Sequence, residues 1–343
     1  MIQIINIEAH EQWDEVVQSF KEYDVYYLNG YVRAFQIHGD GLPTLLHYEE
    51  NGLKAIYVFM KRDTTIEGVY DSVTPYGYGG VLFEGDTSEQ NLNAFWRAYV
   101  DAMKNEGIVD NFVRYHPVLA NALSMKPISN VTDLGKTIAL DLNSPERIWE
   151  NITSKNRNTI RKAEKNGIEI HHGHSWEELQ QFIPIYNATM QKDNAEEYYY
   201  FGEAFYRSIC DDLKGYWELF YATLDGQMIA ASIMLFANNK MHYHLSGSVL
   251  EYRNLAPSNL LLYKAALWGC EQGFETFHLG GGVGSGEDNL YKFKAAFNRN
   301  SDYQFSIGKE IFDEQRYAEL VDIRRTNDPN FNPESHYFPL YRS

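Results

Sequence analysis

Short apolar stretches separated by turn dipeptides recur along the chain and predict β-hairpins. Asn51-Gly52 separates the first pair of stretches, and Asp225-Gly226 separates the second. Both dipeptides accept the positive φ angles of tight hairpin turns. The four predicted strands cover residues 45–49, 54–60, 218–224 and 228–236. Asn238-Asn239 then leads into a further predicted strand over residues 241–248.

Longer segments predict helices at matching places in the two halves. One helix covers residues 88–105 and stops near Gly107, and the other covers residues 257–272 and stops at Gly273. A glycine just past the last turn is a common helix-ending signal. Short apolar strands follow at residues 108–113 and 274–279. We interpret the repeated order as one α/β unit used twice, although two unrelated α/β halves would also fit.

Helix-capping signals place a domain boundary near residue 144. Ser144 can cap a helix, and Pro145 suits its first position. This helix is predicted to run toward Lys165 and to end at Gly167. We therefore expect an N-terminal domain over residues 1–144 and a C-terminal domain over residues 145–343.

The C-terminal half contains three further predicted helices and a tail. Ser175-x-x-Glu178 is a capping box that starts a helix over residues 175–192, with a kink or break at Pro184. The other helices cover residues 202–213 and 313–324. From about residue 327 onward we expect an irregular tail.

Composition narrows the class of protein. The net charge is −17 and the pI is near 5.1, which disfavours a protein that coats DNA or RNA but allows a local basic patch. Two cysteines are too few for a disulfide scaffold or a cysteine-based zinc site. No signal peptide or membrane-spanning segment is visible. We expect a soluble, cytoplasmic protein, and peripheral membrane contact is compatible with the sequence.

A glycine-rich loop over residues 280–286 lies between a predicted strand and a helix. Backbone N–H groups in such a loop can bind an anion, but the sequence matches neither a P-loop nor a dinucleotide fingerprint. A flexible connection is the alternative. In the following helix, Leu290, Phe293 and Phe297 share a face that we expect to be core, while Lys292 is expected to be solvated.

Three other clusters are candidates for binding. Arg157, Arg161 and Lys165 share one helical face, which is either an anion-binding surface or a solvated helix. Tyr76 and Tyr78 alternate with glycines over residues 74–80, as in a cleft lining or a plain turn. Histidines at 242 and 244, and at 171, 172 and 174, lack a third zinc ligand of known position, so we expect no metal.

Four stretches together resemble the Fem-type branch of the GNAT acyltransferase superfamily. They are residues 75–80, residues 158–167, residues 256–262, and residues 280–297 with the pair Phe293-Lys294. The resemblance implies an α/β fold with mixed sheets, built as two tandem GNAT-like domains. The coiled-coil arm of some members is absent, because residues 202–213 are too few to form it.

The resemblance also implies an N-acyltransferase. It would move an acetyl or aminoacyl group from acyl-CoA or aminoacyl-tRNA, with no bound cofactor, to an amine of a cell-envelope or sugar-nucleotide precursor. This chain departs from the GNAT pyrophosphate motif, since Ala256 replaces the central glycine and Pro257 lacks an N–H. The alternative is a non-catalytic GNAT-like module that binds a phosphate-bearing ligand. The sequence leaves the oligomeric state open, and DNA is not an expected partner.

Site residues follow from position and from the resemblance. We expect Lys294, Tyr243 and Asp71 to be catalytic, with Lys294 turned away from the core to stabilise an oxyanion or bind phosphate. Asp71, Tyr243 and His244 are the candidates for a general base acting through water. The expected substrate-binding residues are Tyr76, Tyr78, Arg157, Arg161 and Phe293. The expected donor-binding residues are Arg253, Ser258 and Asn259.

Overall fold

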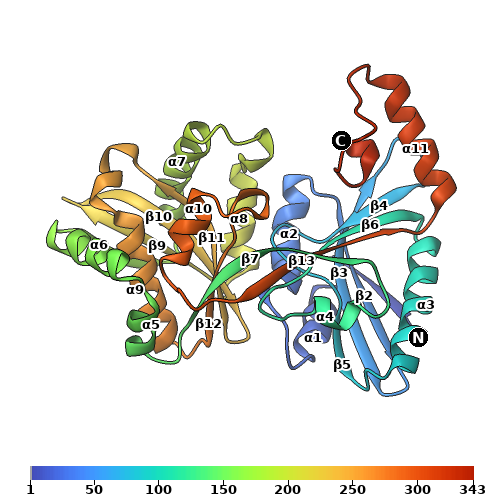
Figure 1. The fold of residues 1–343 in the computed structure, drawn as a ribbon, viewed down its shortest axis with the longest axis horizontal. Coiled ribbons are helices and arrows are strands. Elements are labelled where there is room, and N and C mark those ends of the chain that lie inside the picture. Colours follow the sequence, from blue (N-terminus) through green and yellow to red (C-terminus); the bar gives the residue numbers. More distant parts are fainter. Residues whose placement is uncertain (1) are drawn as a thin grey trace. The chain divides into compact units, whose positions relative to one another are not determined.

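The computed structural model describes residues 2–343 and divides the chain into two compact units (Figure 1). Unit 1 contains the residues up to Leu134 together with Phe305–Ser343, and unit 2 contains Gly135–Gln304. Both units combine helices with mixed parallel and antiparallel strands. The predicted α/β fold class is confirmed.

Unit 1 is formed by the first half of the chain and its C-terminal segment. Its strands are β1 (Ile2–Asn6), β2 (Leu42–Glu50), β3 (Leu53–Asp63), β4 (Tyr70–Val73), β5 (Leu82–Gly85), β6 (Ile108–Arg114) and β13 (Tyr303–Ile311). Its helices are α1 (His10–Gln18), η1 (Val25–Tyr27), α2 (Asn29–His38), α3 (Glu89–Asn105), α4 (Ala122–Met125), α11 (Glu314–Asn327) and η5 (Leu340–Arg342), where η marks a 3₁₀ helix.

Unit 2 is formed by the middle of the chain. Its strands are β7 (Val131–Asp141), β8 (Glu169–Gly173), β9 (Trp217–Leu224), β10 (Gln227–Ala237), β11 (Lys240–Ser248) and β12 (Thr276–Gly280). Its helices are α5 (Pro145–Asn151), α6 (Ser154–Lys165), α7 (Trp176–Lys192), η2 (Glu197–Tyr199), α8 (Glu203–Asp212), η3 (Leu250–Leu255), α9 (Pro257–Glu271), η4 (Val283–Ser285) and α10 (Asn289–Ala295).

The two units have the same strand order and directions. In unit 1 the order is β1-β2-β3-β4-β6-β13, and in unit 2 it is β8-β9-β10-β11-β12-β7. In both, the fourth and fifth strands are parallel and the other neighbours are antiparallel. A helix, α3 or α9, connects the parallel pair, as a parallel crossover requires. If one α/β unit is used twice, as the sequence analysis inferred, the two units are expected to have this same strand order.

The last strand of each unit comes from the other half of the sequence. β13 pairs with β6 over Ile307–Ile311, and β7 pairs with β12 over Ile138–Asp141. The expected boundary at residue 144 therefore differs from the structure, which assigns β7 largely to unit 2 and residues 305–343 to unit 1. The reason is non-local pairing, since each strand completes a sheet whose other strands lie far away along the chain.

Local turn and cap signals predict the structure well. Asn51 and Gly52 both have positive φ, at 51° and 77°, and so do Asp225 and Gly226, at 50° and 78°. These are the φ signs of a two-residue hairpin turn. The Ser175 hydroxyl accepts the N–H of Glu178, whose carboxylate accepts the N–H of Ser175, so the predicted capping box is present.

Two predicted helices differ from the structure. The helix expected from Pro145 to Lys165 is broken into α5 and α6, because Ile152 and Thr153 are extended and Thr153 caps the second helix by accepting the N–H of Asn156. By contrast, α7 continues through Pro184, which lies half-way along it and is exposed.

Each unit has its own hydrophobic core. In unit 2 the strands pack against α5, α6 and α9 through buried residues that include Ile160, Leu261 and Phe277, and α6 lies beside α9 (Figure 1). In unit 1 the core includes Phe59, Phe95 and Tyr99. Within residues 2–343, no helix is both long enough and apolar enough to cross a bilayer.

Candidate functional site

The parallel strands of unit 2 separate part-way along their length. β11 and β12 pair at three positions, the last being His242 opposite His278. From Tyr243 to Ser248, the described part of β11 pairs with β10 alone, and its register shifts at a bulge near His244. β12 continues beside β7 to Gly280. On alternate residues after the separation, backbone N–H groups of β11 point toward the side that β12 has left.

Polar side chains gather where the strands separate. The rings of His242 and His278, both buried, meet edge to face at 5.7 Å, and Nε2 of His278 lies 2.9 Å from the hydroxyl of Thr137. His244 follows on β11, and burial lowers its pKa to about 3. This imidazole is therefore neutral at physiological pH.

Lys294 on α10 organises the glycine-rich loop. Its Nζ donates to the carbonyl of Gly281 at 2.7 Å, and the side chain is only 9% exposed. The side chain is directed toward the glycine-rich loop, where it is buried and does not extend into solvent. Burial lowers the pKa of Lys294 to about 8, while nearby Asp288 raises it. At neutral pH the amine is mostly an ammonium ion that can donate hydrogen bonds.

The loop itself is held at both ends. Asp288 caps α10 by accepting the N–H of Tyr291 at 2.8 Å, and it also accepts the N–H of Val283 at 3.4 Å. Together with the Lys294 bond, these contacts give residues 280–286 a defined conformation.

The apolar face of α10 is smaller than predicted. Phe297 is buried and meets the half-buried Phe293 at 5.6 Å, but Leu290 is 40% exposed. Tyr291 packs on the core instead. The helix is only seven residues long, so Leu290 lies at its exposed first turn.

Tyr243 lies at the start of the separated part of β11. Its hydroxyl is 2.6 Å from the hydroxyl of Ser246. Burial raises the pKa of Tyr243, and the bond with Ser246 lowers it less. A phenol with a raised pKa can donate or accept a hydrogen bond, but it is a poor base at neutral pH.

The N-terminus of α9 has few free donors for an anion. Pro257 is its first residue and has no N–H, and Ala256 has left-handed backbone angles (φ 59°, ψ 46°). The N–H of Asn259 bonds to the carbonyl of Ala256, and its side chain donates to Asn156 at 2.8 Å. Ser258 is half-buried beside it. Arg253 is exposed on η3.

On the basic helix α6, the two predicted arginines lie near the indole ring of Trp149. The guanidinium groups of Arg157 and Arg161 lie 6.0 Å and 5.0 Å from the ring of Trp149. Arg157 also donates to the carbonyl of Trp149 and to the hydroxyl of Ser154. Arg161 is exposed, and so are Lys155, Lys162 and Lys165. The cation-rich face is therefore accessible, with Trp149 as its aromatic centre.

Asp71 does not have the surroundings of a catalytic base. It is fully buried in unit 1, accepts from Arg62 at 2.6 Å, forms an ion pair with Arg342, and accepts from the hydroxyl of Tyr341 at 3.0 Å. Its carboxylate oxygens are already engaged by Arg62, Arg342 and Tyr341, and the side chain is not accessible to a substrate. Asp71 instead fastens η5 to the sheet of unit 1.

The tyrosines of the glycine-rich run belong to an aromatic cluster in unit 1. The ring of Tyr76 stacks on Phe35 at 5.4 Å, and its carbonyl accepts from the hydroxyl of Tyr31. Tyr78 meets Tyr26 and Phe305 edge to face. Both tyrosines are half-buried. The structure therefore places these two residues in a packed loop.

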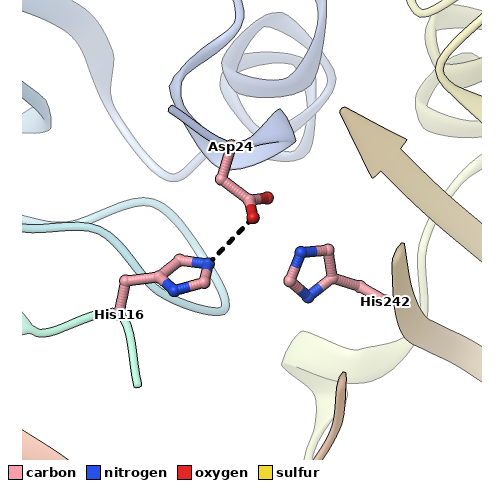
Figure 2. A group of neighbouring side chains, drawn as sticks. All are labelled: Asp24, His116 and His242. Atoms are coloured by element: carbon pink, nitrogen blue, oxygen red, sulfur yellow. Dashed lines mark ion pairs between the residues drawn. The ribbon is translucent and has the colours of Figure 1, made fainter. Parts of the chain in front are cut away.

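A buried pair that was not predicted, Asp24 and His116, is drawn in Figure 2. Nε2 of His116 is 3.2 Å from the carboxylate of Asp24, and both side chains are fully buried. Nδ1 of His116 accepts the N–H of Leu119 at 3.2 Å. The pair lies against the rings of Tyr26 and Tyr78. The two residues are 92 positions apart in the sequence, so no local sequence pattern indicates that they are paired.

The predicted residues therefore fall into two groups. Asp71, Tyr76 and Tyr78 belong to unit 1, and the other predicted residues belong to unit 2. In unit 2 the side chains of Asn156 and Asn259 link α6 to α9. Sequence analysis missed Asn156, although its position three residues after the Thr153 cap placed it in the first turn of a helix.

Comparisons with known proteins agree with this geometry. Residues 154–294 match the acetyltransferase (GNAT) domain family. Over 175 residues the chain is 26% identical to UDP-N-acetylmuramoylpentapeptide-lysine N(6)-alanyltransferase of Weissella viridescens, a match that covers 49% of this chain and about half (50%) of that protein.

Solved structures share the fold of the whole chain. The crystal structure of FemX matches with a TM-score of 0.69 at 15% identity, covering 93% of this chain and 99% of FemX. The C-terminal domain of a lysylphosphatidylglycerol synthetase from Agrobacterium fabrum matches with a TM-score of 0.59 at 15% identity, covering 94% and 97% of the two chains. The chain is thus similar in sequence to a Fem-type alanyltransferase over about half its length, shares the fold of FemX, and carries a GNAT domain match over residues 154–294.

Proposed function

We propose that this protein transfers an aminoacyl group from aminoacyl-tRNA to a primary amine on the peptide of a cell-wall precursor. The Weissella relative supports the acceptor class, since its name specifies a lysine amine of a muramoyl pentapeptide. The acyl donor acts as a co-substrate, and no resident cofactor is proposed.

The N-terminus of α9 is the observation that favours tRNA over acyl-CoA. A pyrophosphate group bound at a helix N-terminus needs free backbone N–H groups. Here Pro257 has none, and the backbone and side chain of Asn259 are already bonded. The exposed cations of α6 around Trp149 offer another way to bind phosphates, and an indole can stack on a base.

The proposed reaction exchanges an ester for an amide. The neutral acceptor amine attacks the ester carbonyl, and a C–N bond forms. The ester C–O bond then breaks, and the proton lost by the amine passes to the leaving ribose oxygen, which becomes a hydroxyl. In this scheme the backbone N–H groups of β11 after Tyr243, together with the ammonium of Lys294, stabilise the oxyanion. Holding both substrates in line supplies much of the remaining rate enhancement.

Product analysis with each donor tests the proposal. The purified protein is incubated with a UDP-muramoyl pentapeptide that contains lysine, together with either alanyl-tRNA or acetyl-CoA. We expect a mass increase of one alanine in the tRNA reaction and unchanged peptide in the acetyl-CoA reaction. Acetylated peptide would reject the donor assignment, and tight binding of both substrates without product would favour a non-catalytic binding module.

A further inference from the structure

One buried amide connects three helices of unit 2 that bear proposed site residues. Asn156, on the first turn of α6, is 4% exposed. Its Oδ1 accepts from Nδ2 of Asn259 at the N-terminus of α9, at 2.8 Å. Its Nδ2 donates to the carbonyl of Ala296, immediately after α10, at 3.4 Å. Both ends of this amide are thus used, each by a different helix.

The carbonyl of Ala296 is a strong anchor for α10. It accepts the N–H of Thr153 at 3.0 Å and the hydroxyl of Thr153 at 3.3 Å, in addition to the amide of Asn156. Lys294 lies two residues before this carbonyl, and its Nζ is fixed at the other end by Gly281. The position of the Lys294 backbone therefore depends on the contact with α6.

We propose that Asn156 is a positioning residue that couples the N-terminus of α9 to the helix carrying Lys294. The expected effect on turnover rests on the proposed function. The coupling itself does not, because it follows from the hydrogen bonds that Asn156 makes with Asn259 and Ala296. Asn259, which the sequence analysis assigned to donor binding, is the residue of α9 through which this coupling acts. A shift of α9 on donor binding would reach α10 through one side chain.

Steady-state kinetics of Asn156→Ala and Asn259→Ala test the turnover effect. We expect each variant to lower kcat about 10- to 100-fold, with less than about threefold change in the acceptor KM, because a small misplacement of a reacting group costs this much. The double variant should be no slower than Asn156→Ala alone, since both substitutions remove one shared bond. Asn166→Ala, at the exposed end of α6, is the matched control and should retain its kcat.

Titration of Lys294 supplies a readout that does not need activity. NMR of lysine-labelled protein, with the Lys294 signal assigned by its loss in Lys294→Arg, gives the midpoint in each variant. We expect the midpoint to rise by about 0.5 pH unit or more in Asn156→Ala, because a loosened α10 lets water reach the amine. If wild-type protein transfers nothing, the proposed function fails and this titration still decides the inference. Unchanged midpoints, or rate effects that multiply in the double variant, would overturn it.

Discussion

Burial shifts the pKa values of two side chains in opposite directions. Lys294 has its pKa lowered to about 8 and stays mostly cationic at neutral pH. Asp110 in unit 1 has its pKa raised to about 7, first by burial and then by the charge of Asp71, against the lowering effect of its bond from Tyr341. The hydroxyl of Tyr341 is 2.6 Å from this carboxylate. Asp110 is therefore partly protonated at neutral pH.

Asp110 should make the protein less stable as pH rises. The folded state holds a proton that the unfolded state releases between about pH 4 and pH 7, so folding is penalised progressively across this range. Asp110→Asn removes the titration. In urea denaturation, its free energy of unfolding should match wild type near pH 4 and exceed it by about 2–4 kcal/mol above pH 7.

The matched control is Asp101→Asn, on the exposed side of α3. Its difference from wild type should be small and independent of pH. If the Asp110→Asn difference is equally flat, Asp110 is ionised throughout, and the account of the Asp71–Tyr341–Asp110 cluster is wrong.

A substitution of Tyr243 can show whether its hydroxyl acts as a hydrogen-bond donor or as the general base. Because burial raises its pKa, its hydroxyl stays protonated at neutral pH. We expect Tyr243→Phe to lower turnover by no more than about tenfold and to leave the pH–rate profile in place, since a general base contributes about 10²–10⁴-fold. Loss of the acidic limb of the profile would show that Tyr243 acts as the base. Tyr252→Phe, half-buried on η3, is the control.

At the level of secondary structure, a fragment of the chain is expected to fold alone only if it includes the strand that completes its sheet, which for unit 2 is β7. β7 covers the edge of β12, and Asn298 and Ser301 also bond to its residues Ala139 and Thr137. Removing β7 would leave backbone N–H and C=O groups of β12 without partners.

Two fragments test this dependence. Residues 135–304, which include most of β7, should unfold cooperatively and give dispersed amide NMR signals. Residues 145–343, although longer, lack β7 and should be aggregated or poorly dispersed. A well-folded 145–343 fragment would show that the predicted boundary at residue 144 is sufficient and that the strand assignment carries no stability.

Sequence patterns predicted the parts of the fold that depend on neighbouring residues. The hairpin turns, the capping box and the helix-ending glycines require particular side chains within a few positions, so they could be predicted directly. The environment of Asp71 could not, because its partner Tyr341 is 270 positions away. For the same reason the exchange of β7 and β13 was missed. Among the predicted site residues, Lys294 was chosen by resemblance and by its position after the glycine-rich loop, but its bond to Gly281 depends on the folded loop.

At the level of the whole molecule, the charge of −17 makes the cationic face of α6 distinctive. If this face binds the phosphates of tRNA, binding should weaken steeply with salt. We expect Arg157→Ala/Arg161→Ala to weaken tRNA binding and to reduce the slope of log K against log salt by about 1.4–1.8, for two lost phosphate contacts. Arg316→Ala/Arg325→Ala, on exposed α11, is the charge-matched control. An unchanged slope would show that α6 is merely solvated.

The most direct test of the central claim is the single-turnover rate of alanyl transfer from tRNA in wild type, Lys294→Met and Lys292→Met. Lys292 is two positions away on the same short helix and is exposed, so it controls for loss of a charge. The account predicts transfer by wild type and Lys292→Met at similar rates, and a loss of about 10²–10³-fold in Lys294→Met, as for one oxyanion contact. Transfer by folded Lys294→Met at the wild-type rate would contradict it.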